Sequence, residues 1–293
     1  MKTPASCLLL LLALVCYVQI GAAQQQNIDP VSLMRHATDN EIAATGTGKG
    51  PFFMYKKTVQ YKDHSYTKEN IETPQGGLSR TLAKNGKPLT PAEQAKEDQK
   101  LKKFAYDKDA RSKVEQSSRE DDQRAIILMR SLPDAFNYTV AGITKDPNGH
   151  ELVHLKFKAK PDWSAPTRET RVLEGMQGDI VVDQTAMRIA EINGVLFKDV
   201  DFGWGILGRL YKGGEFIIHQ AEVGQGKWED VLETLHFNGK ILMVKNLTIW
   251  STETDSDFRP VPANVTTAQA IELLQKADEV VAENGGGGAE KHK

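Results

Sequence analysis

Hydrophobic and polar residues alternate through much of residues 178–252, which is the period expected of half-buried β-strands. β-branched and aromatic residues are frequent in this region, and turn-forming residues interrupt it at short intervals. The pair Asn238-Gly239 is the sharpest turn signal, because Asn-Gly favours a two-residue type I′ hairpin. The pattern therefore predicts a meander of long antiparallel strands, with a hairpin turn at this pair.

The first half of the chain alternates in shorter segments, which predict strands at residues 52–61, 66–72, 78–82, 136–144 and 151–159. Asp29 before Pro30 predicts the start of a short helix, since proline is favoured directly after the N-cap residue. Thr266 and Gln269 have the spacing of a capping box and predict a helix near the C-terminus. Residues 251–264 contain two prolines and are predicted to be irregular.

A strongly charged stretch interrupts the predicted strands. Residues 93–124 contain 18 charged residues out of 32, and an acidic residue often precedes a basic one by four positions. Each such pair supports a helix by about 0.2–0.5 kcal/mol. Thr90 and Glu93 form a capping box at the start, and Pro133 is predicted to end the helix. The segment at about 90–132 is interpreted as a solvated helical insertion, with a docking arm for a cell-envelope protein as the alternative.

The N-terminus predicts a cleavable signal peptide over residues 1–23. Lys2 provides a positive start, residues 8–18 are apolar, and small residues precede the cleavage site. The apolar run is too short for a comfortable membrane span. The sequence therefore predicts export to the periplasm or the medium, a single domain over residues 24–283 and a disordered tail over residues 284–293.

The composition argues against disulfide and thiol chemistry, nucleic-acid binding and a membrane span. Cys7 and Cys16 are the two cysteines of the chain, and both lie within the predicted signal peptide, so neither disulfide nor thiol chemistry is expected after cleavage. The formal net charge of −2 offers no basic excess to neutralise phosphates, which disfavours binding of nucleic acid. No second hydrophobic run approaches the length of a membrane span, so no stable span is expected in the mature protein.

His150 and His154 match the zinc-binding pattern H-E-x-x-H letter for letter. That pattern binds a metal ion only on a helix, where positions i and i+4 share one face. Here it follows the turn residues Asn148-Gly149 and continues as alternating apolar and polar positions, which predicts a strand. On a strand the two histidines would lie about 13 Å apart, too far to share one ion. A coincidental match is favoured, and a zinc hydrolase remains a remote alternative.

A glycine-rich segment at residues 203–208 matches G-x-G-x-x-G. A dinucleotide site requires a helix directly after this pattern, whereas a strand pattern follows here. The segment is interpreted as a flexible loop that, with Phe202 and Trp204, forms a mobile lip over a pocket. No arrangement of catalytic residues emerges from the sequence, so a non-enzymatic protein without a cofactor is predicted.

Several segments carry a resemblance to a known family. The sequences GDIVVD at residues 178–183, RIAEI at 188–192 and KGGEFI at 212–217, followed by Trp228, resemble paired strands of the LolA/LolB-like periplasmic lipoprotein carriers. The segment KNGKPLTPAEQ at residues 84–94 is also similar to segments of other secreted bacterial proteins. The resemblance implies an incomplete β-barrel wrapped around helices, with an apolar cavity that holds acyl chains.

Together these observations predict an α+β protein with a strongly curved antiparallel sheet, an incomplete β-barrel, and helices packed against its concave face. The predicted function is binding or carrying a lipid, an acyl chain or a lipidated protein in an apolar cavity. An interaction or sensing module of the cell envelope without bound lipid is the alternative. The candidate cavity residues are Phe216, Ile218, Leu235, Phe237, Leu242, Val244 and Trp204, although the same residues would also suit an ordinary core.

Overall fold

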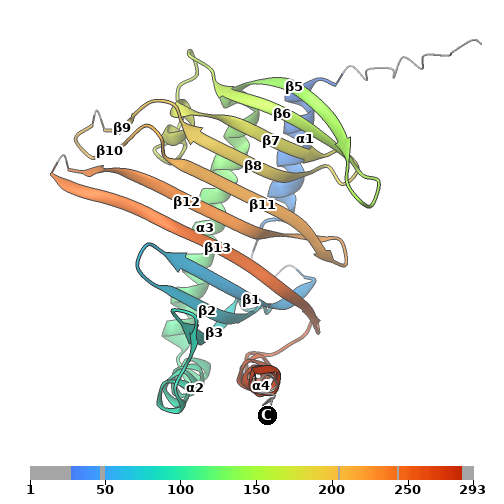
Figure 1. Cartoon of the computed structure of the whole chain (residues 1–293), viewed down its shortest axis with the longest axis vertical. Coiled ribbons are helices and arrows are strands. Elements are labelled where there is room, and N and C mark those ends of the chain that lie inside the picture. The colour runs from blue at the N-terminus through green and yellow to red at the C-terminus, as the bar shows by residue number, and fades with distance from the viewer. Residues whose placement is uncertain (1–27, 47–49, 204, 243, 286–293) are drawn as a thin grey trace, which may run out of the picture.

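The computed structural model has an α+β architecture built on one large antiparallel sheet (Figure 1). It describes residues 28–46, 50–203, 205–242 and 244–285, so the predicted signal peptide and most of the predicted tail lie outside the described residues. Within these residues thirteen strands form the sheet, and its main path runs β4-β3-β2-β1-β13-β12-β11-β8-β7-β6-β5. β4 and β5 are the outer strands of this path, so the sheet is not closed into a barrel.

The strands predicted from the alternation of apolar and polar residues are confirmed, with ends that differ by one or two residues in most cases. The strands are β1 Phe52–Tyr61, β2 Ser65–Ile71, β3 Leu78–Lys84, β4 Lys87–Pro88, β5 Phe136–Lys145, β6 Glu151–Ala159, β7 Met176–Asp183, β8 Arg188–Leu196, β9 Val200–Phe202, β10 Gly208–Leu210, β11 Glu215–Gly224, β12 Lys227–Ile241 and β13 Lys245–Val261. Most paired strands follow one another in the chain. The pairing of β1 with β13 is different, because it joins the two ends of the domain.

The turn predicted at Asn238-Gly239 is wrong. β12 passes straight through this pair, Asn238 lies opposite Thr248, and the chain reverses between Ile241 and Lys245. Glycine is required at position 239 for another reason: a Cβ atom there would lie 2.1 Å from the carbonyl oxygen of Arg209 in the neighbouring strand β10. Gly239 lets the backbones of β10 and β12 approach each other closely. A glycine inside a strand often marks such a close approach and does not always mark a turn.

Residues 251–261 were also predicted wrongly, as irregular chain. They complete β13, because β1 supplies a partner for them from the far end of the sequence. In its last part β13 pairs with β1 alone, so Pro260, opposite Phe53, lies on a locally open edge. Proline is tolerated at such an edge, where no partner strand needs the missing N–H group.

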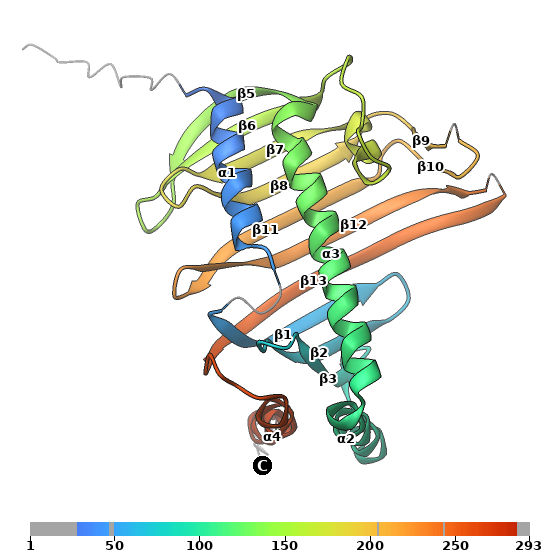
Figure 2. The ribbon, with the colours of Figure 1, turned by 180° about the vertical axis from the view of Figure 1, so that it is seen from behind.

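In the described part of the chain, four α-helices and one 3₁₀ helix accompany the sheet: α1 Pro30–Ala44, α2 Pro91–Tyr106, α3 Lys108–Ala135, η1 Glu169–Gly175 and α4 Thr267–Gly285. α1 and α3 lie on one face of the sheet, whereas α2 and α4 lie beside its β1–β3 end (Figure 2). The predicted caps are confirmed: Asp29 accepts a hydrogen bond from the N–H of Val31, and Thr90 and Glu93 cap α2 reciprocally. None of the described helices is both long and apolar enough to cross a membrane.

The charged insertion is two helices that meet at Asp107. The carboxylate of Asp107 caps the second helix by accepting a hydrogen bond from the N–H of Ala110 at 2.8 Å. The prediction that Pro133 ends the helix is wrong, because Pro133 lies inside the last turn of α3. Leu132 and Ala135 on either side of this proline are buried in the core, so packing holds the turn in place. The insertion is thus anchored to the sheet at its C-terminal end.

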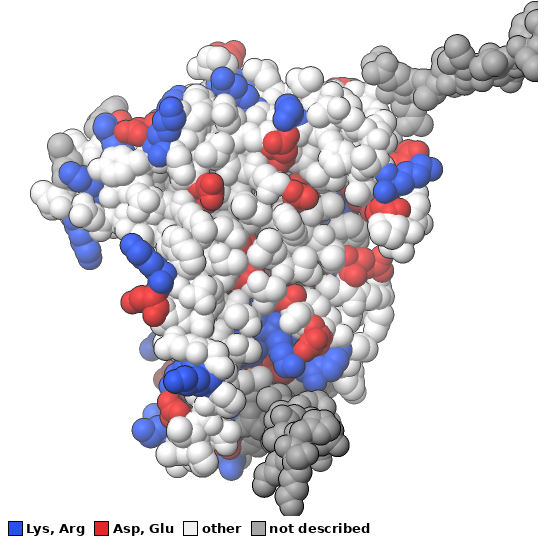
Figure 3. Space-filling view, viewed as in Figure 1, with Lys and Arg blue, Asp and Glu red and all other residues white. Residues whose placement is uncertain are grey.

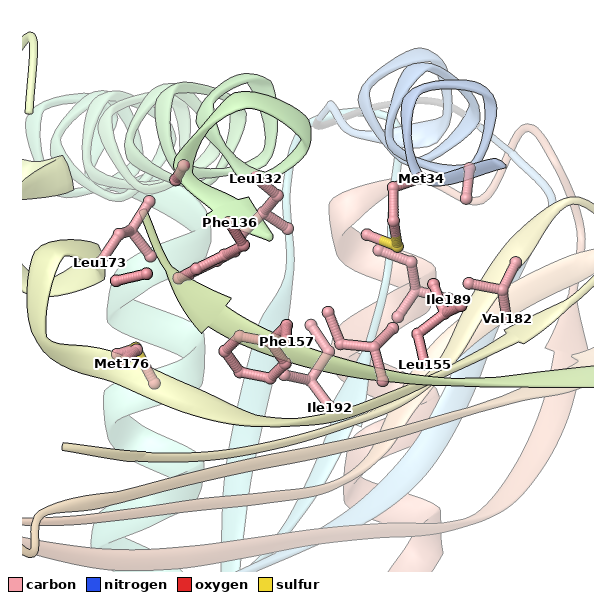
Figure 4. Close-up of a cluster of buried hydrophobic side chains, with 14 of the residues drawn as sticks. Met34, Leu132, Phe136, Leu155, Phe157, Leu173, Met176, Val182, Ile189 and Ile192 are labelled. Carbon is pink, nitrogen blue, oxygen red and sulfur yellow. The ribbon is translucent and has the colours of Figure 1, made fainter. Parts of the chain in front are cut away.

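The main core lies between the sheet and the helices α1 and α3 (Figure 4). Met34 of α1 and Leu132 of α3 point toward sheet residues such as Phe157, and all three side chains are buried. A smaller cluster lies at the other end of the molecule, where Leu101 of α2 and Leu274 of α4 pack against strand residues. Burial of these apolar faces is the main force that holds the helices on the sheet.

Candidate functional site

A polar cavity of about 850 Å³ lies where the end of α1 and the middle of α3 face β1, β11 and β12. The turn between β2 and β3 contributes one further wall. Aromatic side chains of Phe52, Tyr55 and Trp228 line part of the cavity. Its charged lining residues are three cations and six carboxylates, namely Lys57, Arg188 and Lys227 with Glu41, Glu72, Asp121, Asp122, Glu229 and Asp230. The lining therefore carries more negative than positive groups.

Two of the three cations are neutralised by carboxylates of the same lining. Arg188 lies 2.7 Å from Glu41, which also accepts a hydrogen bond from the backbone of β8. Lys227 lies 2.7 Å from Glu72 and 2.6 Å from Glu229. Burial lowers the pKa of Lys227, but its bonds to these two carboxylates outweigh that effect and raise the pKa overall. These cations are held by the wall and are poorly placed to attract an anionic ligand.

Carboxylates gather around the third cation, Lys57. Its Nζ atom lies 2.9 Å from Glu253 and 3.3 Å from Asp255. Burial raises the pKa of Asp255 to about 6, although the attraction of Lys57 opposes this shift. Burial likewise raises the pKa values of Asp230 and Glu233. Desolvated carboxylates of this kind favour a nearby positive charge or a proton.

Asp255 should make the stability of the protein depend on pH. The folded state favours its protonated form, so the folded protein binds more protons than the unfolded chain between about pH 4 and pH 6, and stability falls as pH rises through this window. Replacing Asp255 by Asn removes this titration. We expect urea unfolding to show a larger gain, or a smaller loss, in stability from Asp255→Asn at about pH 7.5 than at about pH 4.

The control for this comparison is Asp162→Asn, because Asp162 is exposed in a loop and the substitution removes the same charge. Its effect should be nearly equal at the two pH values. If Asp255→Asn also changes stability equally at both pH values, the shifted titration of Asp255 is contradicted.

Four of the predicted cavity residues lie in β11 and β12, and none of them lines the charged cavity. Phe216 and Leu235 lie opposite each other on β11 and β12 and pack against the main core, and Phe237 is buried within it. Ile218 lies opposite Ile192 of β8, whose side chain is also in the core. The sheet brings these four residues together, and their role in holding a ligand stays a prediction.

Two further predicted cavity residues lie at the end of a hairpin. Leu242 and Val244 are in the turn between β12 and β13, where their side chains are exposed. Trp204 lies outside the described residues. The structure therefore does not bring Leu242 and Val244 into one apolar pocket with Phe216 and Leu235.

The H-E-x-x-H match is confirmed to belong to a strand. His154 is in β6 and its Nε2 atom lies 2.8 Å from the hydroxyl of Thr144, whereas His150 precedes the strand and lies 2.9 Å from Asp183. The hydrogen bond with Asp183 raises the pKa of His150. The described residues contain no group of three or more His, Cys, Asp or Glu side chains that could hold a metal ion.

The glycine-rich loop connects β9 and β10, which pair with each other as a hairpin. As the sequence predicts, a strand and not a helix follows the loop. The backbone N–H of Leu242 donates to the carbonyl oxygen of Leu207 at 3.3 Å, so this loop lies beside the β12–β13 turn. None of the described residues of this loop lines the charged cavity.

Sequence reasoning missed the charged cavity. One signal was present: Glu233, Leu235 and Phe237 occupy alternate positions of β12 and so share one face of the strand. That face changes from apolar to acidic toward the start of the strand. A charged residue on the inward face of an otherwise apolar strand indicates a polar interior, although Glu233 itself does not line the cavity. The cation whose charge acts on it, Lys57 of β1, comes from a distant part of the chain.

Comparison with known proteins does not show a family for this chain. No family model matches the sequence, and no curated protein matches it. Among solved structures, the crystal structure of a DUF1329 family protein from Desulfovibrio piger ATCC 29098 is similar at 10% identity and a TM-score of 0.26, over 82% of this chain and 97% of that chain. A TM-score this low does not establish a shared fold, and the resemblance to the LolA/LolB-like carriers is not confirmed.

Proposed function

We propose that this protein is exported and that it binds and carries an amphiphilic ligand, a lipid or a lipidated protein, without transforming it. In this proposal the sheet acts as an incomplete, strongly curved β-barrel with α1 and α3 on its concave face. The ligand's head group occupies the charged cavity beneath these helices. Its apolar part follows the aromatic wall of Phe52, Tyr55 and Trp228.

The observation that carries this proposal is the cavity itself. A volume of about 850 Å³ is that of a ligand-binding site, whose usual range is about 300–1,000 Å³. The excess of carboxylates, together with the raised pKa of Asp230, favours a head group that carries a positive charge. An ammonium group, as in phosphatidylethanolamine, meets this requirement, and it would lie beside Asp230.

Native mass spectrometry of protein purified without detergent tests the proposal directly. We expect a co-purifying lipid, identified after organic extraction. Short-chain phosphatidylethanolamine should bind more tightly than short-chain phosphatidylglycerol, because only the former lacks a net negative charge. Asp230→Asn should weaken its binding about tenfold by removing a charge that faces the head group.

The matched control is again Asp162→Asn, which removes an exposed charge away from the cavity and should leave binding unchanged. Protein that is free of lipid and stays free after incubation with membranes would contradict the carrier function. That result would favour the second candidate, a protein-interaction module that uses α2 and the first half of α3. Tyr106 supports this alternative, because it is 88% exposed at the junction of the two helices.

A further inference from the structure

The turn between β12 and β13 and the loop between β9 and β10 form one exposed apolar tip. Its residues are Ile206, Leu207, Ile241, Leu242 and Val244, which we call the hairpin tip. The two loops are held side by side by the pairing of β10 with β12 and by the hydrogen bond from Leu242 to Leu207. Figure 1 shows the ends of these strands projecting beyond the rest of the sheet, at the left.

Large apolar side chains at this tip are unusually exposed. Val244 is 83% exposed, Leu242 60% and Ile206 58%. Scattered single apolar residues are normal on a protein surface, but neighbouring ones at the end of a projection mark a contact surface. Burial in this chain does not explain why the sequence has apolar residues here.

The backbone conformation of Leu242 is also unfavourable. Its φ angle is +49°, in the left-handed region where glycine or asparagine is normally found. A leucine at this turn position is therefore unfavourable for its backbone as well as for its exposed side chain. Such local strain is typical of positions whose side chain is needed for function.

The charge beside the tip is positive. Lys240 and Lys245 are the residues that flank the turn, both are exposed, and neither forms an ion pair with any described residue. Arg209 lies nearby, but Asp201 and Asp199 neutralise it. Figure 3 shows Lys and Arg atoms along the left edge of the molecule, where these strands end. An apolar end flanked by free lysines matches a membrane surface that carries anionic lipids.

We propose that the hairpin tip docks this protein onto an anionic lipid bilayer. The apolar side chains of the two loops insert into the interface, while Lys240 and Lys245 contact lipid phosphates. A narrow, convex projection suits a deformable lipid surface better than the broad, flat contact that a stable protein complex needs. A second copy of this chain is a poorer partner, because it would bring its own lysines against these ones.

This docking goes beyond the proposed ligand binding and can be tested apart from it. The cavity lies near Trp228 at the start of β12, and the tip lies at the end of the same strand. At 3.3 Å per residue the two are about 40 Å apart. A substitution at the tip should leave the cavity and any lipid bound in it unaffected.

Co-sedimentation with lipid vesicles tests the proposal. Protein purified after export, with its mass recorded to confirm that residues 1–23 are absent, is mixed with vesicles of phosphatidylcholine containing about 30% phosphatidylglycerol. We expect binding that weakens at high salt and is much weaker on pure phosphatidylcholine. The double variant Leu242→Asp/Val244→Asp should bind at least about tenfold more weakly. Tyr106→Asp, which changes an aromatic residue of α2 that is 88% exposed, should bind like the wild type.

A fluorescent label distinguishes insertion from simple adhesion. Both natural cysteines lie in the predicted signal peptide, so Val244→Cys and Tyr106→Cys each give a single labelling site in the exported protein. A polarity-sensitive dye at position 244 should shift to the blue with anionic vesicles, and the same dye at position 106 should not. Equal vesicle binding by the double variant, or no shift at position 244, would overturn the proposal. Self-association that the double variant abolishes, without vesicle binding, would overturn it in favour of a second copy.

Discussion

Replacing Glu41 by Ala should lower the free energy of unfolding by about 3–5 kcal/mol, which is the usual cost of removing one partner from a buried ion pair. The side chain of Glu41 is 4% exposed and that of Arg188 12%, with 2.7 Å between them. Glu41 also accepts a hydrogen bond from the N–H of Ile189 at 2.9 Å. The substitution leaves a charge and a buried N–H without partners at the contact between α1 and β8.

Urea denaturation of the wild type and of Glu41→Ala measures this loss. Glu115→Ala is the control, because it breaks the exposed pair of Glu115 and Arg119 on α3 and should cost less than about 1 kcal/mol. A double variant in which Leu replaces both Glu41 and Arg188 should recover part of the stability, since no charge stays unpaired. Equal losses for Glu41→Ala and Glu115→Ala would show that α1 is not held by this pair.

Phe136→Ala is expected to cost about 3–5 kcal/mol, the range for a large aromatic side chain removed from a packed core. Phe136 is 1% exposed and begins β5 directly after α3. Its ring lies 4.7 Å from that of Phe157 and 6.1 Å from that of Tyr138, measured between ring centres. The substitution leaves a cavity at the point where the helical insertion is fastened to the sheet.

The same denaturation experiment, followed by circular dichroism, measures this effect. Tyr106→Ala removes an aromatic ring that is 88% exposed and should change stability by less than about 0.5 kcal/mol. A small loss for Phe136→Ala would mean that the end of α3 rearranges to fill the space. In that case the insertion is less firmly fixed to the sheet than the contacts of Phe136 indicate.

Local sequence signals determined much of this fold. The capping residues Asp29 and Thr90 begin helices where the sequence predicts them, because a cap acts on N–H groups within three residues. Asp146 and Gly149 likewise mark the turn of the β5–β6 hairpin, which is confirmed. The alternation of apolar residues around His154 also correctly predicted a strand there, and not a metal-binding helix. These features depend on neighbours in the chain and can be read without a structure.

Long-range contacts decided the rest. Gly239 looks like a turn residue in the sequence, and only the approach of Arg209 on β10 explains it. β13 extends to Val261 because β1, about 200 residues earlier in the chain, pairs with it.

The candidate sites depend on tertiary structure in the same way. Leu235 and Leu242 are both apolar residues of one hairpin, yet one packs against the core and the other projects into solvent. The cavity gathers Glu41, Lys57 and Asp230 from separate elements. Sequence alone determined the elements and their local ends, whereas the pairing of distant strands decided which side chains meet, because burial and pairing depend on contacts between distant segments.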